Sequence, residues 1–179
     1  MDTPRQAQLM AEYNAWMNAK LYAVAAKLPA AELAKDRGAF FSSILGTLNH
    51  LVVADTLWLK RFAAHPSHPA ALEPVRAMPH PAALNAILFT DLAALKARRD
   101  LLDAAIKAWA AALTQADLDH VLHYANTRGV KAQKRIGTLL AHFFNHQTHH
   151  RGQCTTLLFQ AGEDVGVTDL LALSPDEHG

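Results

Sequence analysis

The distribution of prolines is the feature that most limits how this chain can fold. Of its eight prolines, five lie in one short segment, at positions 66, 69, 74, 79 and 81. Proline has no amide hydrogen to donate and its ring clashes with the preceding helical turn, so residues 65–81 cannot form a regular helix. The long stretches on either side of this segment contain no such cluster, which leaves room for long helices.

Apolar residues recur at helical spacing over four long stretches. The helices we expect cover about residues 3–28, 42–65, 82–113 and 136–160. At the start of the first, Thr3 and Gln6 have the spacing of a capping box. Ser42 or Ser43 can begin the second helix, and Gly162 can end the last.

The segments between these helices complete the expected fold. Residues 65–81 form a long connection of the kind that joins two parallel neighbours in a helical bundle. Residues 119–135 alternate in polarity around the turn residues 127–129, which predicts a short two-stranded ribbon or an extended loop. The tail, residues 163–179, has no period. We therefore predict one all-α domain over residues 1–179, a four-helix bundle with a long crossover loop and a short β-ribbon before the last helix.

Composition and charge exclude several classes of protein. The 17 lysines and arginines nearly balance the 16 acidic residues, so nothing favours binding to nucleic acid or to anionic lipid. The single cysteine, Cys154, cannot form an internal disulfide, which favours a reducing compartment. The first residues lack the apolar core of a signal peptide, and no stretch reaches the roughly 18 apolar residues of a membrane span. We expect a cytoplasmic protein without nucleic-acid or membrane partners.

Histidine is frequent in this chain, with 11 residues, and four of them fall within residues 142–150. His146 and His150 are one helical turn apart, so both imidazoles can reach one metal ion at about 2.0–2.1 Å. A third ligand must come from another helix, and His50, a lone histidine in an apolar helical segment, is the candidate. The alternatives are that these histidines are hydrogen-bonded core residues, or that the clustered four form a solvated face.

The same segment argues against a peptidase of the zincin type. Its His-x-x-x-His spacing matches that motif, but Gln147 stands where the catalytic glutamate belongs, and an amide cannot accept a proton at neutral pH. Among the other groups that could move protons, Asp55 lies about 140° around the helix from His50 and is poorly placed. His142 and Tyr124 are better placed, although residues of these types in such positions are more often ordinary packing residues.

Two strings in this sequence resemble the signature helices of the DinB family, which includes the YfiT-like metalloenzymes. They are LNHLVVADTLWLKRF, residues 48–62, and HFFNHQTHHRGQ, residues 142–153. The strings TDLAALKARRDLLDAAI, residues 90–106, and GVTDLLAL, residues 166–173, also resemble that family, so the similarity extends over most of the chain. The His-Arg-Gly-Gln ending of the second string is its most specific part.

The resemblance implies a fold, an assembly and a metal site. Members of this family are four-helix bundles with the helices in up-down-down-up order, and they are commonly homodimers. Their divalent metal, zinc or nickel among others, is held by three histidines, which correspond here to His50, His146 and His150. All three positions carry the residue that the family pattern requires.

Three neutral imidazoles would leave a divalent ion with its full charge, and two kinds of chemistry follow. A bound water can be acidified toward a pKa of about 7 and attack a small-molecule substrate. A low-molecular-weight thiol can instead bind as its thiolate and attack an electrophile, and some relatives are regarded as thiol-dependent S-transferases. We therefore expect a metal-dependent S-transferase or hydrolase. The alternatives are a non-catalytic metal-binding stress protein and a helical interaction module with incidental histidines.

Overall fold

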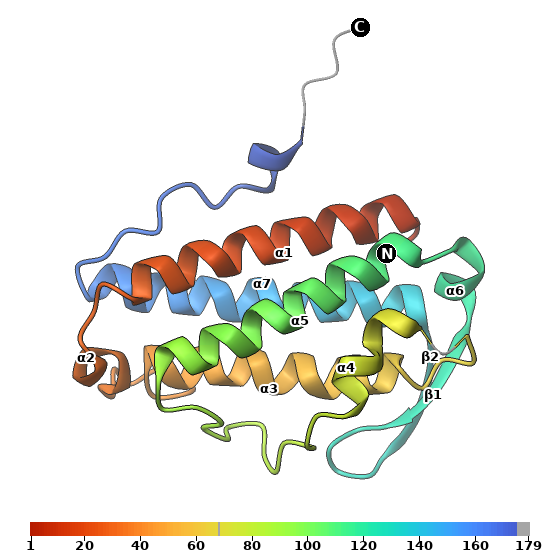
Figure 1. Ribbon diagram of the computed structural model, residues 1–179, viewed down its shortest axis with the longest axis horizontal. Coiled ribbons are helices and arrows are strands. Elements are labelled where there is room, and N and C mark those ends of the chain that lie inside the picture. Colours follow the sequence, from red (N-terminus) through yellow and green to blue (C-terminus); the bar gives the residue numbers. More distant parts are fainter. Residues whose placement is uncertain (68, 175–179) are drawn as a thin grey trace, which may run out of the picture.

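Four long helices form most of the structure, a computed structural model that describes residues 1–67 and 69–174. They are α1 (Pro4–Ala25), α3 (Ile44–Phe62), α5 (Leu92–Ala112) and α7 (Ile136–Gln160). Helix α1 packs against α5 and α7, and α3 packs against the same two helices. Figure 1 shows the four side by side, with α1 and α7 running in one direction and α3 and α5 in the other.

Shorter elements connect the long helices. They are α2 (Ala30–Ala34), the 3₁₀ turn η1 (Ala70–Leu72), α4 (Glu73–Arg76), α6 (Gln115–Asp119), the strands β1 (Val121–Ala125) and β2 (Lys131–Arg135), and the 3₁₀ turn η2 (Leu170–Leu173). The described residues are therefore mostly helical, with one small antiparallel sheet. None of the helices in this part of the chain is both long enough and apolar enough to cross a membrane.

The predicted start of the first helix is confirmed. The Gln6 amide donates to Thr3 Oγ1 at 3.2 Å, and the Thr3 amide donates to Gln6 Oε1 at 3.3 Å. At α3 the cap is Ser43 rather than Ser42, because the Ser43 hydroxyl accepts from the Gly46 amide at 2.9 Å. Both caps satisfy amide groups that the first turn of a helix leaves unpaired.

The third long helix begins about ten residues later than its spacing predicts, which corrects the expected range of 82–113. Its cap is Asp91, whose carboxylate accepts a first-turn amide at 2.8 Å. Before this cap, the Asn49 side chain on α3 accepts from the amides of Leu88 and Phe89 and donates to the Phe89 carbonyl. The backbone groups of Leu88 and Phe89 therefore bond to a side chain on α3 and not to neighbouring residues in a helix. The apolar periodicity of this segment could not predict this, because the partner lies on another helix.

The segment 65–81 forms no long helix, as its prolines predict. Among its described residues only the short turns η1 and α4 are helical, and residue 68 lies outside the described part of the chain. From α4 the chain runs back along α3 to reach the start of α5 (Figure 1). This return brings Leu84 beside His50 and Phe89 beside Asn49 on α3.

The predicted two-stranded ribbon is confirmed. Strands β1 and β2 pair antiparallel, with Val121 opposite Arg135 at one end and Ala125 opposite Lys131 at the other. Gly129 in the connecting turn has a φ of +78°, a backbone conformation that glycine adopts without steric strain. The short helix α6 before the ribbon was not expected.

The tail after α7 packs on α1. The Tyr13 hydroxyl donates to the Thr168 carbonyl at 2.7 Å, and the Lys20 ammonium donates to the Val167 carbonyl. The only regular element here among the described residues is the turn η2, and residues 175–179 of the expected tail lie outside them. These contacts hold the tail against α1, although its sequence has no helical periodicity.

A buried polar network joins the four long helices at their centre. Arg99 on α5 forms ion pairs with Asp55 on α3 and with Asp103 one turn further along α5. Asn14 and Asn18 on α1 donate to Asp103 Oδ1 at 2.9 and 3.0 Å. Buried charges are tolerated in a protein interior when they are paired and hydrogen-bonded in this way.

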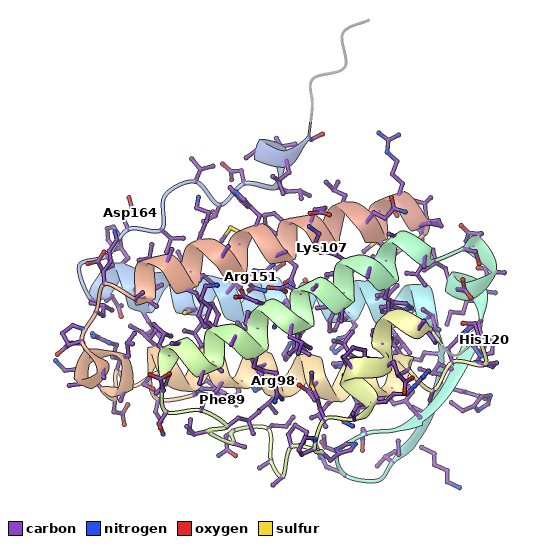
Figure 2. The ribbon with its side chains drawn as sticks, viewed as in Figure 1. Phe89, Arg98, Lys107, His120, Arg151 and Asp164 are labelled. Atoms are coloured by element: carbon purple, nitrogen blue, oxygen red, sulfur yellow. The ribbon has the colours of Figure 1, made fainter. Side chains whose placement is uncertain are left out.

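Helix α7 completes this network. Gln147 Nε2 donates to Asp55 Oδ2 at 2.7 Å, and Arg151 donates to the side chains of Asn14 and Thr148. Figure 2 shows Arg151 lying between the long helices rather than at the surface. We call the following residues the Arg99 network: Asn14, Asn18, Asp55, Arg99, Asp103, Gln147 and Arg151.

Candidate metal site

Three histidines from two helices meet at one point. His50 comes from α3, and His146 and His150 come from successive turns of α7. One ring nitrogen of each lies within 4.8 Å of the others, and the Nε2 atoms of His50 and His146 are 3.3 Å apart. Tetrahedral zinc with nitrogen ligands at 2.0–2.1 Å places its ligand atoms about 3.3–3.4 Å apart. The cluster therefore has the donor atoms that a divalent ion requires, and its His50–His146 pair has the spacing of zinc ligands.

Hydrogen bonds behind two of the rings set which nitrogen faces the centre. His50 Nδ1 lies 2.8 Å from the Leu84 carbonyl oxygen. A carbonyl can only accept, so Nδ1 carries the proton and Nε2 presents its lone pair. His150 Nδ1 makes the same kind of bond to Gln153 Oε1 at 2.8 Å. Neither partner was predicted from the sequence. The position of Gln153, about one turn after His150, is a signal that the sequence does carry, whereas the Leu84 carbonyl depends on the path of the loop before α5.

Phe41 forms a wall of the cluster that the sequence did not predict. Its ring stacks on His50, with 3.7 Å between ring centroids and 16° between planes, and it meets His150 edge-on at 5.4 Å. Phe41 lies in a tight turn before α3, in which the Ser42 amide donates to the Ala39 carbonyl at 2.8 Å and Ser42 has a left-handed φ of +62°. The Phe41 carbonyl packs directly against Gly46 of α3, where there is no room for a side chain.

Gly46→Ala is therefore expected to displace Phe41 from His50. A methyl group at residue 46 would stand 2.1 Å from the Phe41 carbonyl oxygen, so the backbone must move. Overpacking of this kind costs about 1–3 kcal/mol, and we expect a lower melting temperature together with weaker zinc binding. Thermal melts and a zinc titration of the same samples measure the two effects.

The matched control is Gly152→Ala on α7. A methyl group there meets no atom within 4 Å, and alanine favours helix over glycine by about 1 kcal/mol. We expect this variant to be neutral or slightly more stable. Equal losses in the two variants would contradict the role assigned to the close approach at Gly46.

Burial keeps the three imidazoles neutral. The pKa of His50 is lowered to about 4 and that of His146 to about 3, in both cases chiefly because burial disfavours the imidazolium ion. The pKa of His150 is lowered for the same reason, and the bond to Gln153 partly opposes this shift. At pH 7 the cluster is uncharged, and its lone pairs are available to a cation.

These shifts predict that acid destabilises the metal-free protein. An unfolded chain protonates its histidines as the pH falls through about 6.5, whereas folded His50 and His146 stay neutral until about pH 4 and pH 3. Within this window the unfolded state binds more protons, so the free energy of unfolding falls as the pH drops from about 6.5 toward 4. Urea unfolding in the presence of chelator at pH 7.5, 6 and 5 measures the trend.

The double variant His50→Gln, His146→Gln is the control for that measurement. Its unfolded chain has two fewer histidines to protonate, so its stability should depend less steeply on pH across the same window. An unchanged pH dependence in the double variant would assign the effect to other groups.

A pocket opens directly onto the histidine cluster. It measures about 620 Å³, and its walls include Phe40, Phe41, Leu84, Asn85 and Gln153 together with the clustered histidines. The Phe40 side chain stands at its rim and is 84% exposed. A small molecule can therefore reach an ion held by the three histidines.

The other residues considered for a role at the site lie at different distances from the histidine cluster. Asp55 and Gln147 point into the Arg99 network, so neither serves as a base at the cluster, as the sequence predicted for both. Cys154 is fully buried, and burial raises the pKa of its thiol to about 12. The His142 ring lies 6.1 Å from that of His146, while Tyr124 lies further off against Trp58. The part of His142 or Tyr124 in proton transfer stays a prediction.

The fold and the cluster together define a class of protein. A mostly helical chain carries three neutral histidines, and their arrangement fits a divalent metal-binding site beside an open pocket. The DinB family profile matches residues 1–177, and the chain belongs to the DinB family. It is similar to Protein DinB of Bacillus subtilis (strain 168), with 26% identity over 159 residues, which cover 88% of this chain and 87% of that protein. No solved structure matches the chain.

Proposed function

We propose that this protein binds one divalent metal ion, zinc or nickel, through His50, His146 and His150, and that it is a metal-dependent enzyme acting on a small molecule. The favoured reactions are transfer of a low-molecular-weight thiol to an electrophile and hydrolysis. The observation that carries the proposal is the pocket of about 620 Å³ that opens onto the cluster. A purely structural metal site has no need of such an opening, because its ligands enclose the ion.

The chain's own residues would prepare this site in three ways. The Leu84 carbonyl and the Gln153 amide orient two imidazoles so that Nε2 faces the centre. Phe41 covers one side of the cluster and keeps water from His50. A bound ion would supply the charge that acidifies a water molecule or stabilises a thiolate.

The fold and setting expected from the sequence belong to the same proposal. We propose that the four long helices form a four-helix bundle of the up-down-down-up kind, in a single domain. We also propose a cytoplasmic location and assembly as a homodimer. The helix contacts and directions described above support the bundle, while the location and the dimer rest on sequence arguments alone.

Metal content and metal-dependent stability test the proposal. We expect the protein, purified without chelator, to hold about one zinc or nickel ion per chain by elemental analysis. After chelation, adding zinc at about 100 times its dissociation constant should stabilise the fold by about 2.7 kcal/mol, which raises the melting temperature by about 5–10 °C. Absence of metal as purified, with no stabilisation on adding zinc or nickel, would contradict it.

A second measurement separates an enzyme from a non-catalytic metal-binding protein. The metal-loaded and chelated proteins are each mixed with a small thiol and a chromogenic electrophile, and with hydrolysable esters and amides. Turnover that appears only in the loaded protein supports the enzyme. Stabilisation by metal without turnover of either substrate class favours the non-catalytic alternative.

A further inference from the structure

A second pocket, of about 580 Å³, lies next to the pocket at the histidine cluster. Its walls include Leu57, Lys60, Arg61, His80 and Leu84, and Leu84 also lines the pocket at the histidines. Two cationic side chains and a histidine therefore face this cavity, and no carboxylate lines it among the described residues. Leu84 therefore lies on the boundary of both pockets.

Arg61 lies against two aromatic rings that also contact each other. Its guanidinium carbon lies 4.5 Å from the ring centroid of Trp58 and 5.4 Å from that of Tyr124. Contact with these rings restricts the positions that the guanidinium group can adopt, and no described side chain accepts a hydrogen bond from its N–H groups. Such a fork of donors matches the two oxygens of a carboxylate or a phosphate.

The charge of Arg61 has no protein partner in the part of the chain that the structure describes. Several other arginines are paired, for example Arg37 with Glu32, Arg76 with Glu73, and Arg99 with Asp55. Arg61 is half-buried, and burial lowers its pKa. An unpaired, partly desolvated cation is unfavourable, and an anion bound in the pocket would relieve that cost.

Lys60 adds a second positive charge to the same cavity. Its ammonium donates to the Arg76 carbonyl at 2.8 Å, which positions the group without neutralising it. The two neighbouring cations in one concave surface attract anionic ligands more strongly than either does alone.

A continuous row of side chains links this cavity to the histidine cluster. The His146 ring lies 6.1 Å from the His142 ring, and the His142 ring lies 5.2 Å from Trp58, the ring on which Arg61 stacks. On α3, His50 and Arg61 are eleven residues apart and fall on the same helical face. Their Cα atoms are about 16 Å apart at 1.5 Å per residue. A ligand that reaches both ends is extended and larger than a single amino acid.

We propose that the pocket of Arg61 and Lys60 binds the anionic group, a carboxylate or a phosphate, of the same small molecule whose other end meets the histidine cluster. The inference rests on the proposed function, and it names the class of ligand: an extended small molecule with an anionic terminus. Arg61 is the specificity-determining residue, and Trp58 and Tyr124 position it.

A titration of the metal-free protein tests the anion pocket independently of any metal. Succinate and inorganic phosphate are the probes, followed by NMR of the arginine Nε–Hε groups. We expect a saturable shift of the Arg61 signal, and binding that is about ten- to hundredfold weaker in Arg61→Leu. Arg61→Lys, which keeps the charge but loses the fork, should fall between the two.

Arg98→Leu is the matched control for this titration. Arg98 also stacks on an aromatic ring, with its guanidinium carbon 5.4 Å from the Phe89 centroid (Figure 2), but it does not line the pocket. Its loss should leave anion affinity unchanged. Equal affinity in wild type and Arg61→Leu, both folded by thermal melts, would overturn the proposal.

A second titration asks whether the anion pocket and the histidine cluster share one ligand. The zinc-loaded protein is titrated with mercaptocarboxylates from 3-mercaptopropionate to 11-mercaptoundecanoate, and with the mercaptoalcohols of equal length. We expect the carboxylates to gain affinity over the alcohols only once the chain is long enough to bridge the sites, and to lose this advantage in Arg61→Leu. An advantage that is independent of chain length, or that survives in Arg61→Leu, would overturn the shared ligand. Failure to load zinc would count against the metal site alone, because the metal-free titration decides the anion pocket.

Discussion

His146→Ala is expected to reduce zinc affinity by more than about a hundredfold and to abolish stoichiometric metal after purification. His146 contacts both other members of the cluster, with its Nε2 atom 3.3 Å from that of His50 and its ring 4.4 Å from that of His150. Loss of a partner behind a ligand already weakens metal affinity by about 10–100-fold, and loss of a ligand itself should exceed that range. Competition with a zinc-binding dye gives the affinity, and elemental analysis gives the stoichiometry.

Two further variants make this result specific. His149→Ala removes an exposed neighbour that lines the same pocket but is not part of the cluster, and its zinc affinity should stay close to that of the wild type. Gln153→Ala removes the partner of His150 Nδ1 and should weaken binding by about tenfold. If His149→Ala released the metal while His146→Ala retained it, the assignment of the ligands would be wrong.

Arg99→Leu is expected to lower the free energy of unfolding by about 3–5 kcal/mol. Arg99 is 1% exposed and pairs with both Asp55 and Asp103. Its removal leaves two carboxylates in the interior without their cation, and breaking a buried ion pair from one side costs about this much. Such a loss is a large part of the 5–15 kcal/mol that stabilises a typical domain. Urea unfolding of the wild type and the variant measures it.

Arg98→Leu is the control for this stability measurement too, because it changes the same residue type at the preceding position. Arg98 makes no ion pair among the described residues and stacks on Phe89 near the surface, so its loss should change stability by less than about 0.5 kcal/mol. Similar losses in the two variants would show that the buried ion pairs do not determine the effect.

The Arg99 network also bears on the histidine cluster. Asp55 follows His50 by five residues on α3, and Gln147 directly follows His146 on α7. The hydrogen bond between Asp55 and Gln147 therefore ties the two helices together beside the cluster. We expect Arg99→Leu, where it still folds, to bind zinc more weakly than Arg98→Leu, and the same dye competition measures this.

Local signals in the sequence were enough for most of the fold. The capping box at Thr3 and Gln6, the cap at Ser43, the prolines of 65–81 and the turn at Gly129 act within a few residues, so their effects can be predicted without knowing the rest of the chain. The start of the third helix was predicted wrongly because Asn49, which lies far away in the sequence, holds residues 88–89.

For the candidate site, the sequence predicted the three histidines: a spacing of four residues places His146 and His150 on one face, a lone His50 in an apolar helix was the candidate third ligand, and the resemblance to the DinB family pointed to the same three residues. The surroundings of these histidines depend on how the helices and loops pack together. The Leu84 carbonyl, the Phe41 ring and the buried Arg99 network come from segments brought together by packing. Periodicity describes which face of a helix is buried, but the contacts across that face depend on which helices meet and in what register.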